Sequence, residues 1–147
     1  MNGYNITSPK DEIDFQNYYY FRWEYLRKPL NKKLGSEKDS IEDLSIHRMI
    51  KNIDGLIVGV GRIHEISSTS FQIRYFAINK KFRRIGLGTY LMNDLEKTVL
   101  NRKGKLIILN ARDNAVSFYE NLGYNIVKKT NLLYGKIQHY EMIKKII

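Results

Sequence analysis

The chain has 147 residues, of which 43% are hydrophobic and 27% are charged, so we expect one globular domain over residues 1–147 and not a disordered chain. It contains no cysteine, which excludes disulfide bonds, thiolate metal ligands and a cysteine nucleophile. The net charge of +10 indicates an anionic partner, either a polynucleotide, a membrane surface or a phosphorylated cofactor, although a charge that only serves solubility is equally compatible with it.

The first ten residues lack the basic start and the apolar stretch of a signal peptide. No apolar run in the chain approaches the roughly 18 residues that a membrane-spanning helix needs. We therefore expect a cytoplasmic protein with no membrane partner.

A first helix is predicted from Ser8 to about Pro29, because Ser8 fits the N-cap and Pro9 the first helical position. Apolar residues then recur at spacings of three and four, which predicts a buried stripe made of Phe15, Tyr19, Trp23, Leu26 and Leu30. The aromatic and basic residues of 18–23 could instead stack on nucleic-acid bases. Core packing with solvated arginines is the favoured interpretation.

The composition turns polar over residues 31–45, which predicts a loop that carries one short helix. The acids of this loop could attract a cationic amine, or they could simply be solvated. They are Glu37, Asp39, Glu42 and Asp43.

Strands are predicted over residues 46–53 and 56–65, on either side of Asp54-Gly55, a dipeptide that accommodates positive φ in a tight hairpin. A third strand over residues 71–78 completes an antiparallel meander. Helical periodicity follows over residues 89–101.

A further helix is predicted over residues 113–122 and ended by Gly123. The remaining strands are predicted at 105–109, 124–130 and 138–147. With one strand before the first helix, the order is strand, helix, three strands, helix, strand, helix and two strands. The strand–helix–strand passage in the middle predicts a right-handed crossover and a locally parallel pair in a mixed sheet.

The turn between the strand 71–78 and the helix 89–101 is basic and contains Gly86 and Gly88. From Asn79 onward 14 Lys and Arg stand against 5 Asp and Glu, so nearly all of the excess charge follows this point. The N-terminus of a helix has unpaired N–H groups, and glycine lets a ligand approach the main chain, so the turn predicts a pyrophosphate site. A dinucleotide fingerprint is excluded because Leu91 stands where its third glycine is needed, and the Gly-Lys-Ser/Thr of a P-loop is absent.

Three segments resemble the GNAT superfamily of acyl-CoA-dependent N-acyltransferases. Arg83-Arg84-Ile85-Gly86-Leu87-Gly88 is similar to the (Gln/Arg)-x-x-Gly-x-(Gly/Ala) signature of that family, and it follows Tyr75-Phe76-Ala77-Ile78 as it does there. Residues 109–124 resemble the second conserved block of the family. His139-Tyr140-Glu141-Met142 is similar to the last strand of many compact members.

The resemblance implies an α/β (α+β) fold with a central mixed, mostly antiparallel sheet of about six to seven strands, helices on both faces and splayed central strands. It implies that acetyl-CoA or another short acyl-CoA is the co-substrate, and no metal is expected. The pantetheine would pair with Phe76–Ile78, the pyrophosphate would meet the amides of Arg84–Thr89, and Asn114 and Tyr119 would lie near the pantetheine and the sulfur. The expected contacts are Phe76, Ala77, Ile78, Arg83, Arg84, Ile85, Gly86, Leu87, Gly88, Thr89, Asn110, Asn114, Phe118 and Tyr119.

The resemblance also implies direct attack by a primary amine in a ternary complex, which agrees with the missing cysteine. Tyr119 is the expected acid, although Tyr119 could instead pack in the core and Asn114 could cap a helix. Where several members carry a glutamate, this chain has Gln72 and Arg74, so the base is open. The candidates are Glu24, His47, His64, Glu65, His139 and water.

The expected acceptor is a small-molecule or peptide amine, bound by the first helix, the loop 31–45 and the last two strands. A homodimer is compatible with this interpretation, and nucleic acid is not the expected partner. Two alternatives are kept: a basic nucleic-acid-binding module and a non-catalytic relative that binds CoA.

Overall fold

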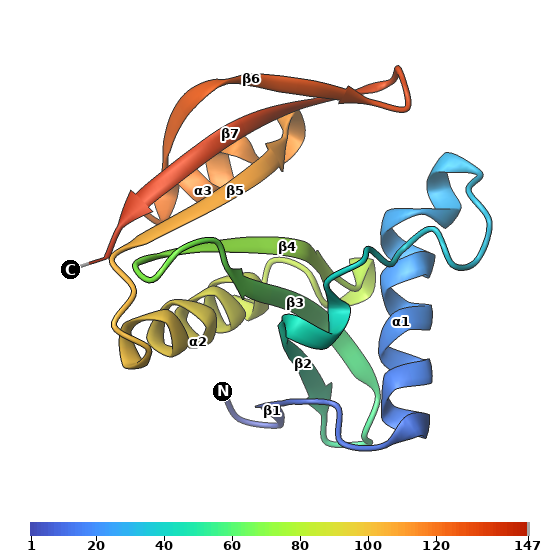
Figure 1. Ribbon diagram of the computed structural model, residues 1–147. Helices are drawn as coiled ribbons and strands as arrows, with labels where there is room; N and C mark the ends of the chain where they lie inside the picture. The colour runs from blue at the N-terminus through green and yellow to red at the C-terminus, as the bar shows by residue number, and fades with distance from the viewer. Residues whose placement is uncertain (147) are drawn as a thin grey trace. The chain divides into compact units, whose positions relative to one another are not determined.

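The computed structural model describes residues 1–146, which form seven strands, three α-helices and four short 3₁₀-helices (Figure 1). The strands are β1 (Tyr4–Thr7), β2 (Ile46–Asn52), β3 (Ile57–Glu65), β4 (Ser70–Ile78), β5 (Leu106–Arg112), β6 (Asn125–Leu133) and β7 (Ile137–Lys145). The α-helices are α1 (Glu12–Leu26), α2 (Leu87–Asn101) and α3 (Val116–Asn121). The 3₁₀-helices are η1 (Lys28–Leu30), η2 (Glu42–Leu44), η3 (Lys80–Phe82) and η4 (Asp113–Ala115).

The strands are hydrogen-bonded in the order β1-β2-β3-β4-β5-β7-β6. The pairs β1/β2, β2/β3, β5/β7 and β6/β7 are antiparallel, whereas β4 and β5 run parallel. This confirms the predicted mixed, mostly antiparallel sheet and its parallel pair around a helical crossover. The hairpin at Asp54-Gly55 is also confirmed, since Gly55 has a φ of +80°.

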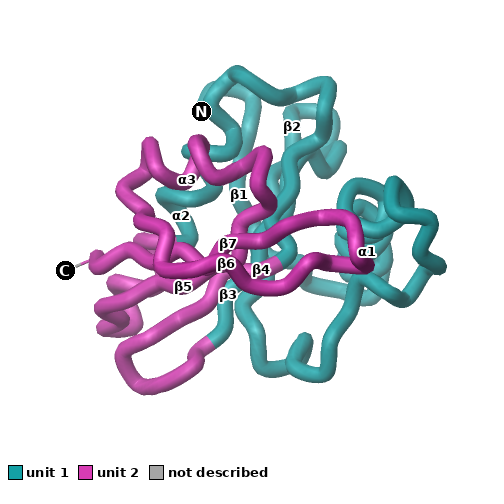
Figure 2. The backbone as a smooth tube through the Cα atoms, turned by 90° about the horizontal axis from the view of Figure 1, so that it is seen from above, with its two compact units in different colours: residues 1–64, 75–95 teal, residues 65–74, 96–147 magenta. Residues whose placement is uncertain are grey.

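The chain divides into two compact units (Figure 2). Unit 1 comprises Met1–His64 and Tyr75–Leu95, and unit 2 comprises Glu65–Arg74 and the described residues from Glu96 onward. The expectation of a single domain stays a prediction.

In unit 1, helices cover both faces of the sheet. Val60 of β3 belongs to a core cluster with Tyr18 and Phe21 of α1. Its neighbour Gly61 faces the other way, because a Cβ at Gly61 would lie 3.0 Å from Leu95 and 3.4 Å from Leu91 of α2. Successive strand residues point to opposite faces, so α1 and α2 pack on opposite sides of β3.

The predicted start of the first helix was wrong, whereas its predicted stripe was right in part, since Phe15, Tyr19 and Leu26 pack against the core cluster of unit 1. Asp11 is the N-cap and accepts a hydrogen bond from the Asp14 amide at 2.8 Å, whereas the Ser8 hydroxyl accepts from Arg48 Nη1 at 3.0 Å. The predicted stripe residues are only partly buried; the fully inward side chains of α1 are Tyr18, Phe21 and Arg22. The apolar pattern of the sequence does not reveal this face of α1, because one residue on the face, Arg22, is charged and its partners lie elsewhere in the chain.

Unit 2 contains β5, β7 and β6, with β6 at the edge of the sheet, together with α3 and the first half of β4. The predicted helix over 113–122 is shorter than expected, since it divides into η4 and α3, and Gly123 follows with a φ of +95°. Glu96 joins two parts of this unit by accepting hydrogen bonds from Tyr124 Oη at 2.8 Å and Lys144 Nζ at 2.9 Å. The last strand, predicted to reach residue 147, ends at Lys145, and residue 147 lies outside the described residues.

Candidate functional site

The turn after β4 is built by Asn79. Its amide donates to the Val58 carbonyl at 2.8 Å, its side-chain oxygen accepts from the Lys81 amide at 2.9 Å, and its carbonyl accepts from Phe82 at 2.9 Å. These bonds fold η3 directly onto the end of the strand. The basic side chains that follow, including Arg83 and Arg84, are therefore displayed next to the strand end.

The turn then enters α2 through two residues in the left-handed region, Arg84 with a φ of +65° and Gly86 with a φ of +90°. The Gly86 carbonyl accepts the Tyr90 amide at 3.0 Å, so Gly86 lies at the start of the helical hydrogen-bond ladder. The amides of the first turn have no acceptor within a helix and carry a partial positive charge. A polyanion fits this surface through the main chain, and Gly86 presents no Cβ against it.

The expected cofactor residues of unit 1 divide by exposure. The side chains of Arg83, Arg84, Ile85 and Thr89 are exposed, and Gly86 is exposed as well. Leu87 has 1% of its surface exposed and anchors the helix in the core, so only its main chain could meet a ligand. In this half of the expected site the structure brings Phe76–Ile78 and residues 83–89 together through the Asn79 turn.

The hydrogen-bonded register between β4 and β5 is short. It runs from Ser70 with Leu106 to Ile73 with Leu109, while β4 continues to Ile78. Within the continuation, Tyr75 has a φ of +56°, and the Arg83 side chain donates from Nε to the Ile78 carbonyl at 3.2 Å. The pairing of β4 with β5 thus ends within β4, before the left-handed Tyr75.

The expected site residues of unit 2 lie on β5, η4 and α3. Asn110 and Asn114 are exposed, and Asn110 Oδ1 lies 3.5 Å from Thr130 Oγ1. Asn114 is not a helix cap, because neither η4 nor α3 has a side-chain cap, so this part of the alternative interpretation is wrong.

Tyr119 is 7% exposed, and its ring contacts those of Phe118 and Tyr124 at centroid distances of 5.0 and 5.9 Å. Burial raises the pKa of the Tyr119 phenol above its ordinary value, and the charge of Arg112 opposes this only in part. The phenol therefore stays protonated and can donate a hydrogen bond, but it does not readily transfer its proton completely.

Among the base candidates, His47 is fixed in a buried network. Its Nε2 lies 2.8 Å from the Glu42 carbonyl and must donate to it, so Nδ1 accepts from Tyr18 Oη at 2.9 Å. Burial lowers the pKa of His47, and Arg22 acts in the same direction. Both ring nitrogens are occupied, so His47 has no lone pair for a substrate proton.

The other candidates have different surroundings. His139 Nδ1 lies 3.0 Å from the Ile137 carbonyl, and His64 Nδ1 lies 3.3 Å from Arg62 Nη2. Glu65 is exposed. Glu24 lines a cavity of about 340 Å³ in unit 1.

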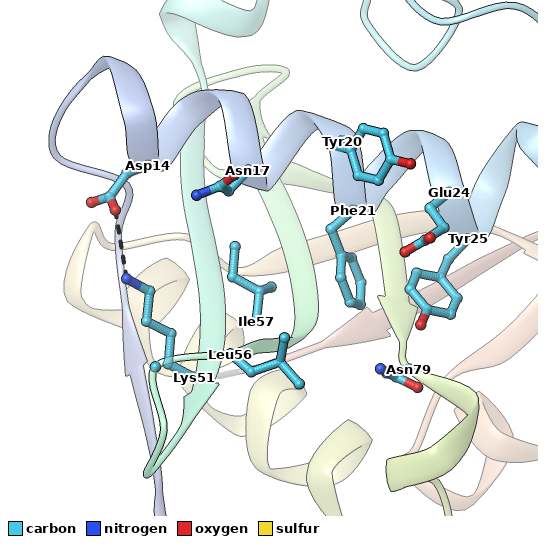
Figure 3. A pocket seen from close by; sticks show the side chains of 11 residues that line it. Asp14, Asn17, Tyr20, Phe21, Glu24, Tyr25, Lys51, Leu56, Ile57 and Asn79 are labelled. Carbon is cyan, nitrogen blue, oxygen red and sulfur yellow. Dashed lines mark ion pairs between the residues drawn. The ribbon is translucent and has the colours of Figure 1, made fainter.

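That cavity lies between one face of α1 and the β2–β3 hairpin (Figure 3). Tyr20, Phe21 and Tyr25 line it beside Glu24, and Asn79 lies at the same end. At the other end Asp14 pairs with Lys51 at 3.5 Å. The cavity thus combines aromatic surface with one further carboxylate, that of Glu24.

The acids of the loop 31–45 do not form a substrate-attracting patch. Glu37 and Glu42 are 2% and 9% exposed, and Asp39 pairs with Arg62 through both carboxylate oxygens, at 2.7 and 2.9 Å. Of the four acids only Asp43 is exposed. Neither attraction of a cationic amine nor simple solvation therefore describes three of them. The carboxylates of Asp39 and Glu42 bind the buried arginines Arg22 and Arg62, and Glu37 Oε1 accepts from the Gly35 amide at 2.7 Å.

Those arginines, Arg22 and Arg62, are the residues that the sequence analysis missed. Neither side chain is exposed. One feature of the sequence could have indicated that these arginines are buried: several acids lie in one loop, and the helix before it and the strands after it contain arginines.

Within residues 1–146 no cluster of three or more His, Asp or Glu has metal-binding geometry. None of the helices in the same range combines the length and the apolar character needed to cross a bilayer.

Comparison with known proteins agrees with this geometry. Residues 31–146 match the family described as an acetyltransferase (GNAT) domain. The Bacillus subtilis (strain 168) protein named "Uncharacterized N-acetyltransferase YjcF" is 30% identical over 136 residues, which cover 92% of this chain and 95% of that protein.

Solved structures show the same fold at low identity. An aminoglycoside 6'-N-acetyltransferase complexed with coenzyme A superposes with a TM-score of 0.80 at 18% identity, covering 97% of both chains. A GNAT family acetyltransferase from Elizabethkingia anophelis with acetyl-CoA bound gives a TM-score of 0.75 at 12% identity, covering 99% of both chains. This chain belongs to the GNAT acetyltransferase family.

Proposed function

We propose that this chain transfers an acetyl group from acetyl-CoA to a primary amine. The observation that carries the proposal is the turn after β4, where the exposed residues Arg83 and Arg84 and the left-handed Gly86 lead into the N-terminus of α2. Such a turn offers main-chain donors and positive charge to a pyrophosphate group. The coenzyme A in the aminoglycoside acetyltransferase complex supports the same co-substrate class.

The strand end beside the turn is proposed to hold the pantetheine and the thioester. Phe76–Ile78 lie beyond the last residue pair between β4 and β5, and the turn with Arg83 and Arg84 follows them directly, so one ligand could extend from this strand end to the turn. An amide of this segment that donates to the thioester oxygen would stabilise the developing negative charge, a contribution of roughly 3 to 4 kcal/mol for one well-aimed donor.

The proposed reaction is direct attack. The amine nitrogen donates its lone pair to the carbonyl carbon, the carbon–sulfur bond breaks, and the sulfur leaves as a thiolate. The amine loses a proton to a base or to water, and the thiolate gains one. Because the sequence has no cysteine, no thioester can form on the enzyme.

Tyr119 is proposed to stabilise the leaving thiolate by a hydrogen bond. Its ordinary pKa already lies about 1.5 units above that of a thiol, which makes complete proton transfer unfavourable by about 2 kcal/mol. Burial raises the pKa of Tyr119 further, so donation of a hydrogen bond suits this phenol better than proton transfer.

The proposed acceptor is a small-molecule or peptide amine. The match to the acetyltransferase (GNAT) domain family and the similarity to a protein named an N-acetyltransferase support an amine acceptor. A homodimer is compatible with the proposal.

The test is release of free thiol from acetyl-CoA in the presence of polyamines, aminoglycosides, amino acids and peptides. We expect thiol release that depends on one amine class, with the acetylated amine detected by mass. A protein that binds CoA but releases no thiol with any amine would be the non-catalytic relative, and the proposed reaction would fail.

A further inference from the structure

Tyr75 has a backbone conformation that a strand residue rarely adopts. It lies inside β4, yet its φ of +56° is in the left-handed region that favours glycine. A buried aromatic residue stays there only when the surrounding structure forces it. Tyr75 directly precedes Phe76–Ile78, the segment that the proposed function assigns to the acyl-CoA.

Three guanidinium groups surround the ring of Tyr75. The Cζ atoms of Arg22, Arg62 and Arg27 lie 4.1, 5.0 and 5.6 Å from the ring centroid. The side chains of Arg22 and Arg62 have no exposed surface, so water does not weaken their attraction to the ring. The ring is therefore held at a fixed place between α1 and β3.

Two carboxylates of the loop 31–45 fix two of these guanidinium groups, those of Arg22 and Arg62. Glu42 Oε2 accepts from Arg22 Nη1 at 2.8 Å and lies 3.1 Å from Arg62 Nη1. Asp39 binds Arg62 with both oxygens. Tyr18 Oη accepts from Arg22 Nη2 at 2.9 Å, so the orientation of each guanidinium plane is determined.

This cluster is not arranged for greatest stability. Nε of Arg22, Nε of Arg62 and Oε1 of Glu42 are buried and have no hydrogen-bond partner among residues 1–146. Buried ion pairs with missing hydrogen bonds are often no more stabilising than packed apolar side chains of similar volume. This cluster adds little stability, yet it surrounds the strained Tyr75 next to a candidate site. Such an arrangement indicates a functional constraint.

We propose that Arg22 and Arg62 are positioning residues for acyl transfer. By holding the ring of Tyr75 they keep its backbone left-handed, and this fixes the direction of the Phe76–Ile78 amides toward the thioester. The proposal rests on the proposed function for its effect on the reaction, but its structural part, the φ of Tyr75, can be tested without any activity.

The first test compares Arg22→Lys and Arg62→Lys with Arg48→Lys. Lysine keeps the charge but loses the planar group that stacks on the ring and binds carboxylates through two nitrogens. Arg48 is the matched control, because it pairs with Asp94 in the same two-nitrogen manner in unit 1, at 2.8 and 3.0 Å. We expect kcat to fall at least tenfold in the first two variants and to stay unchanged in Arg48→Lys.

The second test compares Tyr75→Gly with Tyr75→Leu. Both variants lack the ring, but only glycine adopts a positive φ without strain. We expect kcat of Tyr75→Gly to exceed that of Tyr75→Leu at least fivefold. These two variants test the positioning role even if the lysine variants do not fold. Equal kcat values for Tyr75→Gly and Tyr75→Leu would overturn the proposal.

The structural arm is the scalar coupling between the amide and α protons of residue 75, which reports φ. We expect the coupling of a left-handed residue in the wild type and in Arg48→Lys, and that of an extended strand in Arg22→Lys. An unchanged coupling in Arg22→Lys, or wild-type kcat in both lysine variants, overturns the positioning role. Absence of activity in the wild type with the expected change in coupling would refute the proposed function alone.

Discussion

At the residue scale, the buried phenol of Tyr119 is the clearest candidate for a catalytic group. Tyr119→Phe removes the oxygen but keeps the ring contacts with Phe118 and Tyr124. We expect kcat to fall about tenfold to a hundredfold, because a charge-assisted hydrogen bond contributes about 1.5 to 3 kcal/mol. The Kd for CoA, measured by calorimetry, should stay within twofold.

The pH profile provides a control on this role. Because burial raises the pKa of Tyr119, the phenol stays protonated beyond the ordinary tyrosine value near 10. The wild-type kcat should therefore not decline near pH 10. A decline near pH 10 that is present in the wild type and absent from Tyr119→Phe would mean that Tyr119 titrates normally and is not the buried donor.

His47 gives a prediction about stability. Burial lowers its pKa, so the folded protein binds this proton less readily than the unfolded chain, whose histidine has a pKa near 6.5. The free energy of unfolding should be constant above about pH 6.5 and decrease as the pH falls below it, by at most about 1.4 kcal/mol per pH unit for this group. Urea unfolding at pH 7 and pH 5 should show a smaller decrease in His47→Gln, and an equal decrease in both proteins would contradict this assignment.

The buried arginines show where residue-level prediction from the sequence fails. Arg22 was expected in solvent, but Glu42, its carboxylate partner, lies 20 residues away in the chain. A charged residue becomes a core residue only when the fold brings its counterion to it, and no local pattern contains that information.

At the element scale, the turn between β4 and α2 should depend on Gly86. Gly86→Ala strains a backbone with a φ of +90° and places a Cβ on the proposed phosphate surface. We expect the Kd for CoA to rise at least tenfold. Gly35→Ala is the matched control, because Gly35 also has a positive φ, +106°, with no atom within 4 Å of the added Cβ.

Calorimetric titration with CoA distinguishes the two glycine variants. Both should lose a similar stability of about 1 kcal/mol from the strained backbone, but only Gly86→Ala should lose affinity. Equal affinities would show that Gly86 does not face the ligand.

The loop 31–45 should depend on Glu42 for its attachment. Glu42→Gln leaves the guanidinium groups of Arg22 and Arg62 without their shared carboxylate, and breaking a buried pair costs about 3 to 5 kcal/mol. Asp43→Asn, in the same loop but exposed, should change the free energy of unfolding by less than about 0.5 kcal/mol. Similar values for the two variants in urea unfolding would contradict the buried network.

The elements themselves were largely predictable. The β2–β3 hairpin follows from Asp54-Gly55. Helix α2 follows from an apolar period of five residues, all of which are buried except the partly buried Tyr90; the period consists of Leu87, Tyr90, Leu91, Leu95 and Val99. The errors fall where side-chain chemistry competes with periodicity. Asp11 replaces Ser8 as the N-cap of α1 because the Ser8 hydroxyl binds Arg48, which is 40 residues away.

At the scale of the whole molecule, the charge of +10 has acquired a partial explanation. The turn at residues 80–84 contributes four of the basic residues, and on the proposed function it faces the phosphates of CoA. The fold and the strand–turn–helix passage around residues 79–89 could be predicted from motifs, and phosphate binding by this turn stays a prediction. The strained Tyr75 and the network that holds it could not, because they depend on contacts between α1, β3 and the loop 31–45.

The measurement that tests the central claim most directly is calorimetric titration of the wild-type protein with CoA, acetyl-CoA and a polynucleotide at two salt concentrations. We predict one CoA bound per chain with a micromolar Kd, and weak polynucleotide binding. An absence of CoA binding together with tight, strongly salt-dependent binding of the polynucleotide would contradict the account and favour a nucleic-acid-binding module.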